Sequence, residues 1–230
     1  MQPFAFEHVS TLAGAVQAAA HTEAAFLAGG TTLIDLMKLD VMRPDVVIDI
    51  NRLGDSGLGK IERNSDGLRL GALVRMADAA AHPDVRRDFP MIAQSLDLAA
   101  SAQLRNMASL GGNVLQRTRC TYFRDVSYAA CNKRIRGSGC AALDGVNRMH
   151  AVLGVSDRCI AIYPGILCRP SLPSTRLSRL TGRVESGCGA VAVGWACLLP
   201  PLSSGGALPN FRTGFEKRAL SEWVSAGLAL

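Results

Sequence analysis

The chain has 230 residues, of which 48% are hydrophobic, 19% charged and 5% aromatic, so it can bury a sizeable and mainly aliphatic core. Its formal net charge is +6, but no Lys/Arg cluster is interleaved with aromatic residues that could stack on bases, which argues against nucleic-acid binding. No apolar run approaches the ~20 residues that a membrane span needs.

The N-terminus, Met1-Gln2-Pro3-Phe4, lacks the basic start and the apolar core of an export signal, which predicts a cytoplasmic location. Seven cysteines in a chain without such a signal favour reduced thiols or metal ligands over disulfides. We therefore treat the cysteines as candidate ligands.

Residues 1–56 have the pattern of a small α/β unit. Short apolar runs predict three strands: 4–6, 24–28 and 46–50. Ser10-Thr11 can cap an Ala-rich helix that extends to Ala20, and a second helix is expected where Leu33, Leu36 and Met37 lie at helical spacing. Strands that alternate with helices in this way predict a parallel sheet.

Residues 57–165 are expected to form a second unit. The turn 64–67 precedes the alternating residues 68–70, which predicts a β-hairpin. Helical patterns follow at Met76–Ala81 and Met91–Ala100, with breaks at His82-Pro83 and Phe89-Pro90. An antiparallel sheet with helices is the predicted arrangement.

The first motif is Phe26–Leu33, in which a predicted strand enters Gly29-Gly30 and Thr31-Thr32 begins a helix. Paired glycines let backbone N–H groups approach an anion, and a helix start adds partial positive charge. The motif is neither GxGxxG nor a Walker sequence. From these residues alone, a phosphate site and a purely structural turn both remain open.

The second motif is Arg105–Asn113, which is expected to be a turn around Gly111-Gly112. Asn106, Ser109 and Asn113 could donate hydrogen bonds to phosphate or ribose oxygens. Taken alone, this motif is equally compatible with a structural turn.

Together, Ala-Gly-Gly-Thr-x-Leu near residue 30 and Leu-Arg-Asn-x-Ala-Ser-x-Gly-Gly-Asn near residue 110 resemble the FAD-binding subunit of the molybdenum hydroxylases. That family includes xanthine dehydrogenase, carbon monoxide dehydrogenase and aldehyde oxidoreductases. The resemblance covers residues 4 to about 165. It implies an α+β fold, the two-subdomain FAD module of the vanillyl-alcohol-oxidase type, followed by a C-terminal domain that we expect to be missing here.

By this resemblance, two glycine loops hold FAD. The cofactor-binding residues that it implies are Ala25, Phe26, Leu27, Ala28, Gly29, Gly30, Thr31, Thr32, Leu33, Asn106, Ser109, Gly112 and Asn113. No side chain stands out as a general acid or base, so we expect no catalytic residue.

Cys120, Cys131, Cys140 and Cys159 contain no close CxxC pair, which is unusual for structural zinc. The spacing of iron–sulfur ligands varies more widely. On spacing alone, the four cysteines could also be unrelated thiols that share no site. The sequences around these cysteines, 116–125, 131–134, 137–143 and 150–156, resemble the aldehyde-oxidising branch of the family.

That branch carries an inserted [4Fe–4S] segment. The resemblance implies an insertion at about 116–159 in which the four cysteines are the cluster ligands. Tyr122, Phe123 and Tyr128 are expected to pack around it, and His150 is expected to be a packed or hydrogen-bonded residue.

Residues 166–230 depart from the family because they contain no Asp and are rich in Leu and Ser. A frameshift is our hypothesis for this change, since a shifted reading frame can encode the family's continuation. We expect a poorly ordered tail, unpaired strand edges and weak FAD retention.

The function implied by the resemblance is an electron-transfer flavoprotein subunit. Its partners would be a molybdopterin-binding large subunit, where substrate is oxidised, and a [2Fe–2S] small subunit, in a heterotrimer that passes electrons to an external acceptor. A partner that bears a signal could export the complex to the periplasm. Two alternatives are an inactive truncated remnant and a zinc-binding structural domain.

Overall fold

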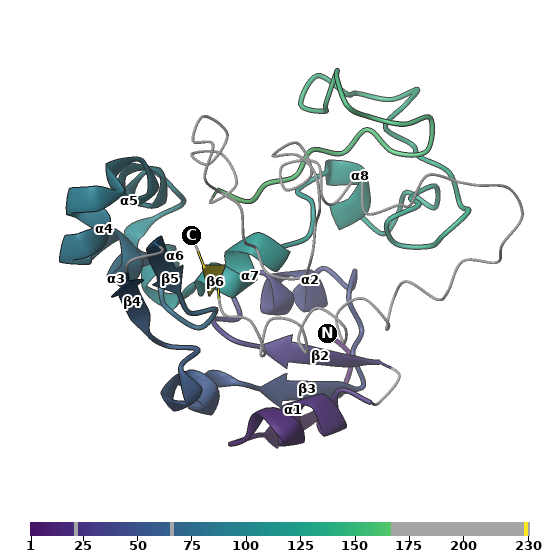
Figure 1. Ribbon diagram of the computed structural model, residues 1–230. Helices are drawn as coiled ribbons and strands as arrows, with labels where there is room; N and C mark the ends of the chain where they lie inside the picture. The colour runs from purple at the N-terminus through teal and green to yellow at the C-terminus, as the bar shows by residue number, and fades with distance from the viewer. Residues whose placement is uncertain (21–22, 65–66, 167–227, 230) are drawn as a thin grey trace, which may run out of the picture.

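The structure is a computed structural model that describes residues 1–20, 23–64, 67–166 and 228–229. Two three-stranded sheets are surrounded by short helices (Figure 1). None of the helices in these described ranges is long and apolar enough to cross a membrane.

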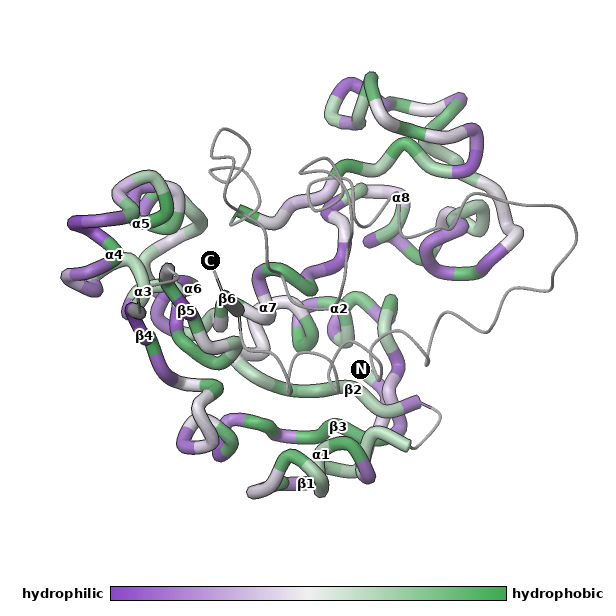
Figure 2. The backbone as a smooth tube through the Cα atoms, viewed as in Figure 1, coloured by the Kyte–Doolittle hydropathy of each residue, from purple (hydrophilic) through white to green (hydrophobic). Residues whose placement is uncertain are grey.

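The first sheet is parallel, as the sequence predicted, with strand order β1-β3-β2. Its elements in chain order are β1 (Ala5–His8), α1 (Leu12–Ala18), β2 (Ala24–Leu27), α2 (Leu33–Lys38) and β3 (Val46–Asp49). Figure 2 shows hydrophobic residues along β2 and β3, and Ala25, Val47 and Ile48 of these strands are buried. The carboxyl ends of the strands therefore meet at one edge, where the first glycine motif begins.

Helix α1 packs on this sheet through its alanines. Its first turn is capped by Thr11, whose side-chain oxygen accepts a hydrogen bond from the Gly14 N–H at 3.1 Å. Ala15 is fully buried and belongs to the same apolar cluster as Ile48 of β3. Since side chains alternate along a strand, the neighbouring Val47 points to the opposite face of the sheet.

The second sheet is antiparallel. The predicted hairpin is confirmed by the pairing of β4 (Ile61–Asn64) with β5 (Gly67–Leu70). Strand β6 (Leu228–Ala229) pairs with the other edge of β5, so this edge is covered opposite Arg69 and Leu70, where unpaired edges were expected. The rest of the prediction for the tail lies outside the described residues.

Four helices follow the hairpin: α3 (Met76–Ala81), α4 (Pro83–Asp88), α5 (Pro90–Asp97) and α6 (Ala102–Met107). The sequence predicted breaks at the two prolines and missed α4 and α6. Each proline is in fact the first residue of a helix, a position where its missing N–H costs no intrahelical hydrogen bond. The prolines therefore separate successive helices.

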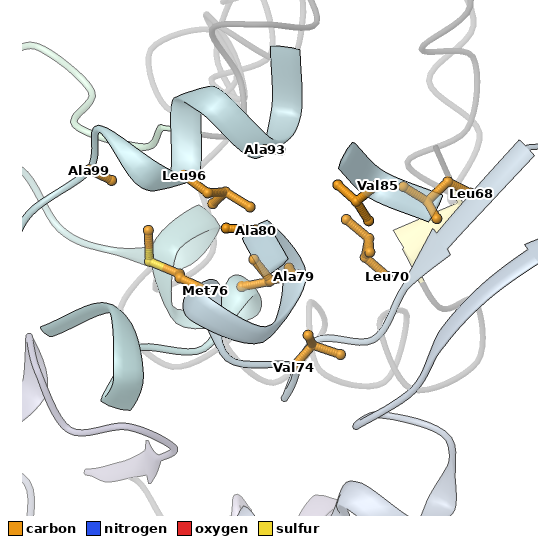
Figure 3. Packing of buried hydrophobic residues seen from close by; sticks show 11 residues of the cluster. Leu68, Leu70, Val74, Met76, Ala79, Ala80, Val85, Ala93, Leu96 and Ala99 are labelled. Atoms are coloured by element: carbon orange, nitrogen blue, oxygen red, sulfur yellow. The ribbon is translucent and has the colours of Figure 1, made fainter. Parts of the chain in front are cut away.

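These helices cover the hairpin and form the larger core (Figure 3). Leu68 and Leu70 of β5 face Val85 of α4, and Leu96 of α5 packs over Ala80 of α3. This core holds the segment that carries the second glycine motif, because Leu110 is also fully buried in it.

Two further short elements belong to the candidate sites, namely the 3-10 helix η1 (Asn51–Ser56) and helix α7 (Leu110–Leu115). The prediction of a turn at Gly111-Gly112 is wrong, since both glycines lie inside α7. The physical reason is the cap, because the Ser109 side-chain oxygen accepts the Gly112 N–H at 3.1 Å and satisfies a free donor of the first turn. Beyond α8 (Thr121–Arg124), residues 125–159 form loops that lie away from α3–α5 (Figure 1).

Candidate functional site

The first glycine motif forms a loop at the carboxyl end of β2. Ala25–Leu27 lie in β2, Leu33 begins α2, and residues 28–32 form the bend between them. Gly30 adopts the left-handed conformation at φ 71°, which favours glycine. Among the described residues, no acceptor is seen for the backbone N–H groups of residues 29–33. A row of free backbone donors of this kind suits a phosphate group.

The two glycine motifs lie against each other. A Cβ added at Gly29 would be only 1.9 Å from the carbonyl oxygen of Met107, so only glycine permits this approach. Met107 precedes Ser109 and α7 by a few residues. The structure therefore brings together two motifs that are far apart in the sequence.

A polar network, which the sequence analysis missed, ties these segments together. Asn51 donates from Nδ2 to the carbonyl oxygen of Ala28 at 3.0 Å. Arg75 donates to Asn51 Oδ1 at 3.0 Å and also to the carbonyl oxygen of Met107. The position of Asn51, directly after the third parallel strand, is a sequence signal that could have identified it.

Asp49 anchors this network. Its Oδ1 accepts from the Asn51 backbone N–H at 2.9 Å and from Asn51 Nδ2 at 2.6 Å, and its Oδ2 lies 3.0 Å from His8 Nδ1. Partial burial opposes ionisation, but the hydrogen bonds from Asn51 and His8 outweigh it and lower the pKa of Asp49. The ionised carboxylate thus fixes the position of Asn51.

The groups of the second motif that were predicted to bind a ligand mostly form hydrogen bonds within the protein. Ser109 is buried and caps α7, and the Leu110 and Gly111 N–H groups donate to the carbonyl oxygens of Val74 and Ala72. Asn113 is buried as well, and its Oδ1 accepts from the Ile166 N–H at 3.0 Å. Asn106 is exposed at the end of α6.

The structure brings the four predicted cysteines together around one small cavity. Cys131 is buried, and Cys120, Cys140 and Cys159 are half-buried. The walls also include Tyr122 and Phe123, two of the three aromatic residues expected there. The expectation for Tyr128 is wrong, because its exposed ring packs edge-to-face on Tyr122 and does not line the cavity. Within the part of the chain that the structure describes, no three His, Cys, Asp or Glu side chains are placed to hold a single metal ion.

The environment of Cys120 and Cys159 disfavours the charged form of these two thiols. Burial raises the pKa of Cys120, and the nearby Cys131 and Cys159 raise it further. Burial likewise raises the pKa of Cys159, with added contributions from Cys140 and Cys131. Thiols grouped in this way release protons when they bind a metal, because the ligand is the thiolate.

The segment that carries the four cavity cysteines is called the cysteine segment, and its two ends lie side by side. Thr118 donates from its hydroxyl to the carbonyl oxygen of Ile162 at 3.1 Å. Gln116 donates from Nε2 to the carbonyl oxygen of Pro164 at 3.4 Å. The cysteine segment therefore begins and ends at the same place on the rest of the protein.

The cysteine segment also packs on α2, the helix that begins at the first glycine loop. Phe123 is buried in an apolar cluster with Leu36 of α2 and Cys131. Arg124 forms an ion pair with Asp35 of α2. Helix α2 thus contacts both candidate sites.

His150 is hydrogen-bonded rather than free, in line with what the sequence suggested. Its Nε2 lies 3.1 Å from Cys120 Sγ, a contact between residues 30 positions apart. Sequence reasoning did not connect His150 with any cysteine.

The sequence model for the FAD-binding domain of molybdopterin dehydrogenases matches residues 2–154. The chain belongs to this family. Relatives in this family are subunits of oxidoreductase complexes. Both glycine motifs and three of the four cavity cysteines fall within the match.

Individual relatives are similar over part of their length. The FAD-binding subunit PaoB of an aldehyde oxidoreductase from Escherichia coli is 53% identical over 166 residues, which cover 71% of this chain and 51% of that protein. The carbon monoxide dehydrogenase medium chain of Hydrogenophaga pseudoflava is 33% identical and covers 40% of this chain and 32% of that one. The chain thus spans about half or less of these relatives.

Among solved structures, carbon monoxide dehydrogenase from Hydrogenophaga pseudoflava matches with 30% identity and a TM-score of 0.47, over 50% of this chain and 40% of that chain.

Proposed function

We propose that this chain is the electron-transferring FAD subunit of a molybdenum-containing aldehyde oxidoreductase. The observation that carries the proposal is the first glycine loop, whose backbone N–H groups at 29–33 have no acceptor among the described residues and lie beside the second motif. Family membership and the 53% identity with an aldehyde oxidoreductase subunit support this assignment.

In this proposal the backbone N–H groups at 29–33 bind the FAD pyrophosphate, with Thr31 and Thr32 as further donors. The Asn51–Arg75 network holds this loop against Met107, so the binding surface is formed before the ligand arrives. The predicted roles of Asn106, Ser109, Gly112 and Asn113 toward FAD are retained as part of the proposal. The fold is taken to be the two-subdomain, vanillyl-alcohol-oxidase-type module.

A [4Fe–4S] cluster held by Cys120, Cys131, Cys140 and Cys159 is the finer part of the proposal. It is supported by four soft ligands around one cavity in a segment whose ends meet. A cubane distributes its ligands over four irons, so its thiolates are spaced more widely than those of a single ion. When bound, FAD and the cluster supply the electron-transfer chemistry, and the protein positions and tunes them.

The partners that we propose are a molybdopterin-binding large subunit, a [2Fe–2S] small subunit and an external electron acceptor. The 53% identical relative is a FAD-binding subunit of an aldehyde oxidoreductase, which supports a multi-subunit assembly.

The test is expression of residues 1–230, anaerobic reconstitution with iron, sulfide and FAD, and measurement of the bound flavin and iron. We expect both cofactors to bind. Replacing any one of the four cavity cysteines by serine should reduce the iron content without removing FAD. Cys188→Ser is the matched control, because Cys188 is not one of the four cysteines that the proposal assigns to the cluster.

Each alternative has its own outcome. A folded protein that binds zinc but no flavin would indicate a zinc-binding domain. An aggregate without either cofactor would indicate an inactive remnant. Iron content that is unchanged in all four serine variants would remove the cluster from the proposal.

A further inference from the structure

We propose that His150 is a positioning residue for Cys120, donating a hydrogen bond from Nε2–H to the thiolate and thereby making the reduction potential of the bound cluster less negative. This inference rests on the proposed [4Fe–4S] site. It assigns a role to a side chain outside the set of four ligands.

The geometry carries the inference. His150 Nε2 lies 3.1 Å from Cys120 Sγ, within hydrogen-bonding distance of sulfur. The cavity formed by the cysteines is lined by Cys120 but not by His150, among the described residues. The imidazole therefore reaches the sulfur from behind the cavity wall, where it can donate without occupying a ligand position.

The direction of the hydrogen bond follows from chemistry. A thiolate bound to iron has no proton, so only the imidazole can be the donor. The other ring nitrogen, His150 Nδ1, is buried and has no partner among the described residues. An unpaired lone pair is tolerated better in such a place than an unpaired N–H, which favours the tautomer with its proton on Nε2.

The surrounding backbone holds the imidazole in this orientation. The His150 N–H donates to the carbonyl oxygen of Asn147 at 2.9 Å, and the Ala151 N–H donates to that of Ile160 at 3.0 Å. The Tyr122 ring lies 6.0 Å from the imidazole, centroid to centroid, and the Tyr122 hydroxyl accepts the Val146 N–H at 2.6 Å. The donor is therefore fixed in place by its own loop.

This contact distinguishes Cys120 from the other ligands. Within the described part of the chain, Cys120 is the one cavity cysteine whose sulfur has a side-chain hydrogen-bond partner. Reduction adds negative charge to a cluster and its thiolates, so a donor at one sulfur stabilises the reduced state more than the oxidised state. Hydrogen bonds to the sulfurs are one of the main determinants of iron–sulfur potentials.

The experiment compares His150→Phe, which removes the donor, with His150→Gln, which retains an N–H donor. Both are reconstituted in the full chain, and the midpoint potential is measured by an EPR-monitored redox titration alongside the iron content. We expect a more negative potential for His150→Phe and a value nearer to wild type for His150→Gln. His82→Phe is the matched control, since His82 Nδ1 is also buried without a hydrogen-bond partner in the described residues, with Asp84 Oδ2 at 4.0 Å. His82 lies between α3 and α4, away from α8 and the cysteines (Figure 1).

A second measurement uses wild-type protein, so that it does not depend on whether a variant folds. Protein labelled with ¹⁵N-histidine should show a ¹⁵N coupling to the reduced cluster in pulsed EPR. Absence of that coupling would overturn the inference, as would a His150→Phe cluster with unchanged potential. Failure of wild-type protein to take up iron is a different outcome, because it would reject the cluster itself.

Discussion

Gly29 shows how one missing side chain determines the geometry of the first site. Its Cα faces the carbonyl oxygen of Met107 so closely that no Cβ fits. Asn51 donates to the Ala28 carbonyl oxygen in the loop, and Arg75 donates to both Asn51 and the Met107 carbonyl oxygen, so these two side chains join the loop to Met107. The position of the loop therefore depends on single residues from three segments.

Gly29→Ala should separate the two motifs and weaken FAD binding. We expect a loss of about 1–3 kcal/mol in stability from overpacking, together with reduced flavin content. Urea unfolding and the ratio of flavin to protein measure the two effects. Gly54→Ala is the control, because nothing lies within 4 Å of a Cβ at that position. Equal flavin content in both variants would contradict the prediction.

Asp49 makes stability depend on pH. Its pKa is lowered in the folded state, so its contribution is present above the unfolded value of about 4 and is lost as pH falls through the folded value. Asp49→Asn should therefore be less stable than wild type at neutral pH, and the difference should shrink in acid. Urea unfolding over a pH series tests this, with the exposed Asp55→Asn as control. A difference that does not change with pH would refute it.

At the scale of elements, α2 and α8 join the two candidate sites. Helix α2 begins at the glycine loop, and its Leu36 packs against Phe123 of α8. The ion pair between Asp35 and Arg124 is partly exposed, so it adds little beside this apolar contact. Burial of Phe123 is thus the main link between the cysteine segment and the first glycine loop.

Phe123→Ala should destabilise the fold by about 3–5 kcal/mol, because it leaves a cavity beside Leu36. It should also lower iron retention, since Phe123 forms part of the cavity wall. Chemical unfolding and iron analysis measure the two effects. Phe4→Ala, at an exposed aromatic residue, should change neither. A similar loss in both variants would argue against a specific role of Phe123.

At the scale of the whole molecule, the fold is two small sheets with their helices, to which a cysteine-bearing segment is attached. The first glycine loop lies at the edge of the parallel sheet, and the second glycine motif packs on the core that covers the antiparallel sheet. A ligand that contacts both motifs should therefore stabilise the two halves together.

FAD should raise the melting temperature of the whole chain. Binding to the native state alone stabilises it by about 2.7 kcal/mol when free FAD is about 100 times Kd. A thermal-shift titration measures this effect, and Gly29→Ala should show a smaller one. If the melting temperature of wild type does not respond to FAD, the proposed site is wrong.

The sequence by itself determined the parallel α/β unit and the hairpin, and its resemblance to the family selected four of the seven cysteines. The first two features are local, since alternation and helical spacing can be seen within short segments. The incorrect predictions made from the sequence also arose from local patterns. The prolines at 83 and 90 indicate breaks but also suit a first helical turn, and a glycine pair indicates a turn unless a cap such as Ser109 supports a helix.

Only the tertiary structure decided which groups meet. Asn51 reaches Ala28, Arg75 reaches Met107, and His150 reaches Cys120, each across more than twenty residues of sequence. No periodicity encodes such pairs, because they depend on how packed elements place side chains in space. The tertiary structure also decided that the four cysteines line one cavity. Their spacing in the sequence was equally compatible with four thiols that share no site.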